Sequence, residues 1–166
     1  MPLLQNSFDW SGVSKYPVVP YEAKVIDYDD SGDIGSFNNG LGNFVTLKLD
    51  IEGKTIYLTF AHLKQYSVTD KIKQAKNDGS VIPIGTIIGE TGQTGVAENP
   101  AYPEYAPYGY AVHLHMQAGT SLETEYGDSR YADANTDDVP PVYMMGFRKE
   151  DVITLSALGD EDPAGI

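Results

Sequence analysis

The sequence contains no cysteine, so no disulfide can stabilise the fold and no thiolate can hold a metal ion or act as a nucleophile. Any metal site must therefore use imidazole, carboxylate or amide groups. Histidine is also scarce, with three in 166 residues. A chain of this length can still bury a core of its own, because a domain of this size hides enough apolar surface without crosslinks.

Basic residues are few, with 11 Lys and Arg against 24 Asp and Glu, and the formal net charge is -13. Such a charge repels the phosphates of nucleic acids and anionic membrane surfaces, so neither is expected as a partner. No apolar run is long enough to span a membrane, and Met1 to Gln5 lacks the features of a signal peptide. We therefore expect a protein that is made in the cytoplasm and has no membrane span.

The middle of the chain alternates apolar and polar residues with a period of two, which is typical of half-buried β-strands. We expect strands at 23–28, 43–51 and 55–62, the last two forming an antiparallel hairpin. A short helix is expected within 64–78. These elements predict a mainly β fold.

Two of the three histidines are set two residues apart, in the motif His113-Leu114-His115. In an extended strand this spacing puts both imidazoles on one face, with apolar residues on the other. Converging imidazoles suit a metal site with an adjacent acid or base. The alternative is an exposed strand face that carries histidine by chance.

The third histidine, His62, ends the predicted hairpin in phase with the apolar residues Ile56, Leu58 and Phe60. This phase is typical of a hydrogen-bonded, partly buried histidine rather than a catalytic one. The strand pattern alone therefore does not assign His62 to a site.

Three blocks, taken together and in order, resemble the lysostaphin-like zinc endopeptidases of bacterial cell walls and phages. They are Phe60-Ala61-His62-Leu63, then Gly85-Thr86-Ile87-Ile88-Gly89 with Thr91-Gly92-Gln93-Thr94-Gly95, then His113-Leu114-His115. The resemblance covers roughly residues 5–118 and implies a β domain at 1–118, with a compact antiparallel core and a groove. Residues 119–166 remain as an irregular acidic extension and a candidate docking segment for a larger assembly.

The resemblance implies one zinc ion held by Asp9 and His115, with His62 and His113 acting on the attacking water and the oxyanion. In the family, a histidine four residues before the aspartate is the remaining ligand, whereas this chain has Gln5 there. A neutral amide oxygen is a weaker zinc donor than imidazole. We therefore expect weakened zinc binding and impaired or lost catalysis.

Four tyrosines, interleaved with prolines, precede the motif His113-Leu114-His115. They are Tyr102, Tyr105, Tyr108 and Tyr110. Tyrosine offers an amphipathic face to sugars and peptides, and proline stiffens a loop. We expect these tyrosines to bind substrate as a wall of the groove. Tyrosines that merely pack a long loop onto the surface are an equal alternative.

Two functions follow from this pattern. The first is a peptidoglycan-directed binding or structural component, associated with a phage or phage-like particle, whose groove binds a peptidoglycan peptide or a protein partner. The alternative is an active zinc endopeptidase that cleaves peptidoglycan peptide cross-links. A phosphocarrier-like domain would explain paired histidines but not the other two blocks.

Overall fold

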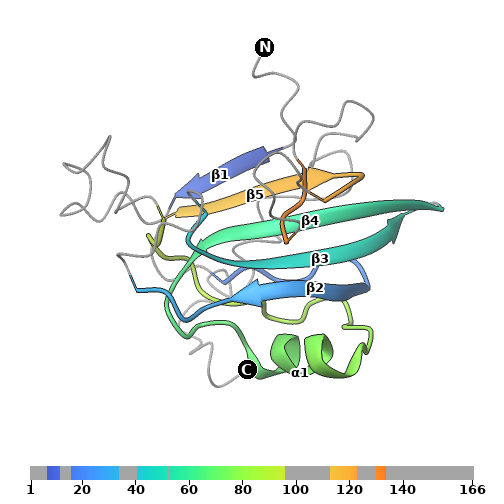
Figure 1. The fold of residues 1–166 in the computed structure, drawn as a ribbon, viewed down its shortest axis with the longest axis horizontal. Helices are drawn as coiled ribbons and strands as arrows, with labels where there is room; N and C mark the ends of the chain where they lie inside the picture. The colour runs from blue at the N-terminus through green and yellow to red at the C-terminus, as the bar shows by residue number, and fades with distance from the viewer. Residues whose placement is uncertain are drawn as a thin grey trace, which may run out of the picture.

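The computed structural model describes residues 7–11, 16–33, 41–51, 53–95, 113–122 and 130–133. Over these residues the chain is mainly β, with one antiparallel sheet and one helix, which confirms the predicted class (Figure 1). The sheet has the strand order β1-β5-β4-β3-β2. The elements are β1 (Ser7–Ser11), β2 (Ala23–Asp29), β3 (Asn43–Ile51), β4 (Lys54–Leu63), α1 (Asp70–Asp78) and β5 (His113–Gly119).

The strands β3 and β4 form the expected antiparallel hairpin, which turns beside Gly53 with a φ of 81°. The first and last strands pair with each other although most of the chain separates them. β5 also pairs with β4, so it lies between β1 and the hairpin (Figure 1). This order places β5 directly beside β4, with β1 on the other side of β5.

The hydrophobic core lies on one face of the sheet. Alternate residues of β3, β4 and β5 point into it, and α1 contacts β2 below the sheet in the view of Figure 1. Its fully buried members include Val45, Leu47, Phe60, Leu58, Leu114, Met116, Ile72 and Ile88.

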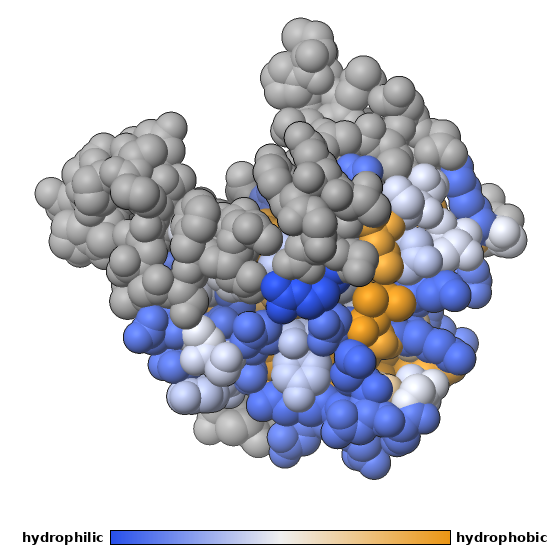
Figure 2. All heavy atoms as spheres, in the orientation of Figure 1, coloured by the Kyte–Doolittle hydropathy of each residue, from blue (hydrophilic) through white to orange (hydrophobic). Residues whose placement is uncertain are grey.

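Figure 2 shows that the visible described surface is mostly hydrophilic, apart from a narrow hydrophobic strip. Within the described part of the chain, no helix is long and apolar enough to cross a membrane.

The helix α1 lies within the expected range 64–78 and begins only at Asp70, because the residues before it form a turn. Ser67 N–H donates to Lys64 O at 3.1 Å, and α1 begins after Thr69. The helix ends at Gly79, whose φ of 72° lets its N–H donate to Ala75 O. Hydrogen bonds from the Ser80 side chain and backbone lower the pKa of the exposed Asp78 carboxyl.

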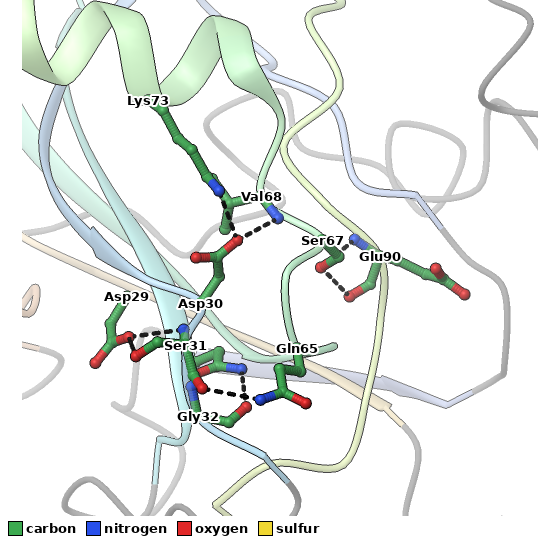
Figure 3. Close-up of polar contacts among 10 residues, drawn as sticks. Asp29, Asp30, Ser31, Gly32, Gln65, Ser67, Val68, Lys73 and Glu90 are labelled. Atoms are coloured by element: carbon green, nitrogen blue, oxygen red, sulfur yellow. Dashed lines mark hydrogen bonds and ion pairs between the residues drawn. The ribbon is translucent and has the colours of Figure 1, made fainter.

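A buried carboxylate ties the end of β2 to the beginning of α1. Asp30 is 6% exposed, and its Oδ2 accepts a hydrogen bond from Val68 N–H at 3.2 Å. The same oxygen lies 3.1 Å from Lys73 Nζ of the helix (Figure 3). A charge held in this way is stabilised by its partners, and removing it leaves the lysine without its anion.

We expect Asp30→Asn to lower the free energy of unfolding by about 2 kcal/mol, because a hydrogen bond and an ion pair to a buried charge are both weakened. Denaturant unfolding measures this loss. Asp29→Asn is the matched control, since the Asp29 carboxylate accepts hydrogen bonds from the neighbouring Ser31 in an exposed turn and the change should cost roughly 0.5 kcal/mol. Equal losses in the two variants would contradict the structural role of Asp30.

The face opposite the core is partly covered by residues 130–133, which we call the strap. Ala132 N–H donates to Thr59 Oγ1 at 2.9 Å, and that oxygen lies 2.7 Å from Thr46 Oγ1. The Tyr131 ring packs edge-on against Phe44, with centroids 4.8 Å apart. Part of the extension that the sequence assigns to irregular structure is therefore packed on the sheet.

Candidate functional site

The strand β4 is irregular at His62. Ala61 pairs with Phe44 and Leu63 pairs with Asn43, so His62 is an extra residue, a β-bulge. Its φ of 60° lies in the left-handed region, which residues other than glycine seldom adopt. The bulge breaks the period of two, and Leu63 takes the place in the apolar core that the alternating pattern gives to His62.

Because of the bulge, His62 lies beside His115. Ala61 is directly opposite His115 in the β4–β5 pair, so a regular strand would turn the next side chain to the other face. Instead the two imidazole ring centroids are 5.8 Å apart, with their planes at 60°. His62 is buried and His115 is half-buried. The structure thus brings together two of the site residues named from the sequence.

The loop after residue 89 fixes the ring of His62. Its Nδ1 lies 2.7 Å from Thr94 O, and a carbonyl oxygen can only accept, so Nδ1 carries the proton. The lone pair of the neutral ring is then on Nε2. Thr94 Oγ1 accepts from Asn43 N–H and donates to Leu63 O, so one threonine holds both strands at the bulge.

A glutamine fixes the ring of His115. His115 Nε2 lies 2.8 Å from Gln117 Oε1, and Gln117 Nε2 donates to Ala132 O at 2.6 Å. Because Ala132 O must receive the amide N–H, the amide oxygen faces the imidazole. His115 Nε2 therefore carries the proton, and the lone pair of the neutral ring is on Nδ1.

The remaining residues expected in the site are placed only in part. Asp9 of β1 occupies the register position directly opposite His115, and His113 lies opposite Ser11. For Asp9 and His113 only the backbone is described. Gln5 lies outside the described residues, as do Tyr102, Tyr105, Tyr108 and Tyr110.

The described side chains can be compared with what zinc requires. Among them, no three carboxylate or imidazole groups gather in an arrangement that could hold a metal ion. A metal-binding histidine usually donates its other ring N–H to an oxygen, as His115 does to Gln117. The described side chains therefore fit one imidazole ligand, His115 through Nδ1, while Asp9, the second donor that the resemblance implies, is described only in its backbone. Zinc enzymes generally keep three protein ligands, which is one more than these two donors.

Sequence reasoning gave no separate role to Thr94 or Gln117. Thr94 belongs to a block that carries the resemblance, but nothing in the block indicates that its carbonyl holds a histidine. Gln117 could have been found, because it lies two residues after His115 and so shares its face of the strand. Gln93, which precedes Thr94 in the chain, has a buried Oε1 without a hydrogen-bond partner among the described residues.

Comparisons of the chain with protein-family models, with curated proteins and with solved structures found no significant match. The likeness to lysostaphin-like enzymes therefore depends on the three sequence blocks, and membership of that family is a proposal. The geometry around His62 and His115 stands independently of it.

Proposed function

We propose that the chain carries a lysostaphin-like groove that binds peptidoglycan peptides, with little or no zinc-dependent cleavage. One observation carries the proposal, namely the bulge that turns His62 toward His115. Left-handed backbone at a residue other than glycine costs about 1 kcal/mol or more, and such strain gathers at functional sites. A β-strand that only builds the core does not need a strained residue of this kind.

The two imidazoles suit proton transfer. His62 can accept a proton at Nε2, because Thr94 O holds the Nδ1 proton and with it the ring orientation. His115 and Asp9 would hold zinc, which when bound polarises a carbonyl and lowers the pKa of a bound water toward 7. His113 would complete the acid and base groups.

Gln5 is the reason to propose binding rather than cleavage. With an amide at this position, one imidazole and one carboxylate remain as strong zinc donors. Proton transfer by His62 without a Lewis acid does little for a peptide bond, whose carbonyl needs activation. The groove can nevertheless keep its shape and bind a peptide or a protein partner, for example within a phage or phage-like particle.

An active zinc endopeptidase is the second candidate. The observation that favours it is the hydrogen bond on each ring, which fixes the nitrogen that carries the proton in His62 and in His115. Such preorganisation is typical of catalytic groups. In this case Gln5 would act as a ligand or be dispensable.

Cosedimentation with insoluble peptidoglycan, together with assay of released soluble fragments, tests the proposal. We expect the native protein to sediment with peptidoglycan and to release no fragments above background. Tyr105→Ala combined with Tyr108→Ala should weaken binding roughly tenfold, the usual effect of losing aromatic contacts at a binding surface.

Tyr57→Ala is the control, because Tyr57 lies opposite Gly119 at the far end of the β4–β5 pair from His62 and should leave binding unchanged. Stoichiometric zinc and fragment release by the native protein would establish the endopeptidase instead. Absence of cosedimentation would refute peptidoglycan as the ligand.

A further inference from the structure

We infer that Gln117 is a positioning residue for His115, and that the strap at residues 130–133 holds Gln117 in place. The hydrogen bonds that support this are independent of what the groove binds. Only the use made of His115 Nδ1 rests on the proposed function.

The amide of Gln117 is oriented by the strap. Its Nε2 donates to Ala132 O at 2.6 Å, and its Oε1 faces His115 Nε2 at 2.8 Å. A flipped amide would bring two oxygen acceptors together at Ala132, which is unfavourable because neither can donate. Ala132 O therefore determines which end of the glutamine faces the histidine. His115 must therefore carry a proton on Nε2, because the glutamine oxygen that faces it can only accept.

The strap cannot shift this carbonyl without leaving the sheet. Ala132 is fully buried, and its N–H donates to Thr59 Oγ1, which is buried on β4. Asp133 N–H donates to Ser121 O, and a Cβ on Gly119 would lie 2.0 Å from Asp133 O. The Arg130 guanidinium lies 5.2 Å from the Phe44 ring centroid. Backbone, side-chain and ring contacts thus all hold the strap in one position.

These contacts form a continuous path from Thr59 through Ala132 and Gln117 to His115. Each step is a hydrogen bond between groups that are buried or half-buried, and such a chain of contacts can couple two parts of a protein. Docking of the strap therefore keeps the His115 proton on Nε2 and the lone pair on Nδ1. Lifting the strap would release both.

Proton NMR of the full chain with ¹⁵N-labelled histidine tests this inference without substrate or metal. In the native protein we expect a His115 Nε2–H resonance that is protected from solvent exchange. Gln117→Leu removes the acceptor, so the resonance should be lost. Gln117→Glu keeps an acceptor oxygen for the histidine but has no N–H for Ala132 O, so the resonance should remain and its solvent exchange should be faster than in the native protein.

Thr59→Val tests the contribution of the strap, because it removes the hydroxyl that anchors Ala132 but keeps the size of the side chain opposite Gln117 in the β4–β5 pair. Exchange of the His115 Nε2–H should become about fivefold faster or more, the factor that corresponds to the loss of one hydrogen bond. Gln65→Leu is the matched control, since Gln65 also donates its amide to a backbone carbonyl, Ser31 O, but lies outside this path. It should leave the His115 resonance unchanged.

A native protein without a protected Nε2–H on His115 would overturn the inference, even if the Gln117 variants failed to fold. An unchanged resonance in Gln117→Leu would also overturn it. An unchanged exchange rate in Thr59→Val would mean that the strap does not hold Gln117 in place. Failure of peptidoglycan binding would affect only the proposed function, because none of these signals involves a ligand.

Discussion

Replacing Gln5 with histidine should raise the affinity for zinc at least about 100-fold, because a strong third donor would join His115 and Asp9. The structure supports this with two features. Asp9 stands directly opposite His115 in the register of β1 and β5, and the His115 ring is held with its lone pair on Nδ1. Little further free energy is then needed to organise the ligands, since the strands and the supporting hydrogen bonds exist without the metal.

Metal analysis after dialysis measures the effect. The native protein should retain little zinc, whereas Gln5→His should retain about one ion per chain, the number that a single site can hold. Asn6→His is the matched control, because it adds an imidazole to the same segment one residue out of place. Asp9→Asn added to Gln5→His should abolish retention.

Three results would count against this view. Stoichiometric zinc in the native protein would mean that Gln5 is a ligand or is not needed. Equal retention by Asn6→His and Gln5→His would mean that the metal binds elsewhere. Absence of zinc from every variant would mean that Asp9 does not face His115, and the roles assigned to the segment around Gln5 would fail.

The hairpin could be predicted from the sequence because its cause is local. Val45, Leu47 and Leu49 alternate with polar residues, and this pattern fixes both the strand and the face that is buried. The predicted range 43–51 coincides with β3, and 55–62 lies within β4. Pairing of β1 with β5 has no such local cause, and only the family resemblance suggested that Asp9 and His115 belong together.

The bulge at His62 could not be predicted from the alternation, because its causes lie in other parts of the chain. His62 N–H donates to Leu41 O, and its ring is held by Thr94. The period-two pattern describes one strand and contains no information on these contacts. It therefore assigned His62 to the apolar face, whereas the three sequence blocks together assigned it to the groove.

The packing of the strap could not be predicted from the sequence for a different reason. Residues 130–133 lie in an acidic stretch with neither helical nor strand periodicity, so the sequence indicates irregular structure there. What holds them is a set of single contacts, such as the Tyr131 ring against Phe44 and the Ala132 N–H on Thr59. Such contacts depend on the finished sheet surface, and no short-range pattern records them.

The second large effect is expected from Gly42→Ala, which should lower the free energy of unfolding by about 3 kcal/mol. Gly42 has a φ of 60°, where an added Cβ costs about 1 kcal/mol. That Cβ would also lie 2.3 Å from the Thr94 carbonyl carbon and 2.5 Å from its carbonyl oxygen. Crowding against backbone typically adds 1–3 kcal/mol, roughly, because the neighbouring chain must move.

Gly79→Ala separates the two causes of this loss. Gly79 has a φ of 72°, but an added Cβ there would meet nothing within 4 Å, so only the backbone cost of about 1 kcal/mol is expected. Denaturant unfolding of the two variants measures the difference. NMR of the His62 Nδ1–H adds a local test, since displacement of Thr94 O by Gly42→Ala should expose that proton to solvent exchange, while Gly79→Ala should leave it protected. Equal losses of stability with an unchanged His62 signal would mean that Gly42 does not position Thr94, and that the bulge is held by the strands alone.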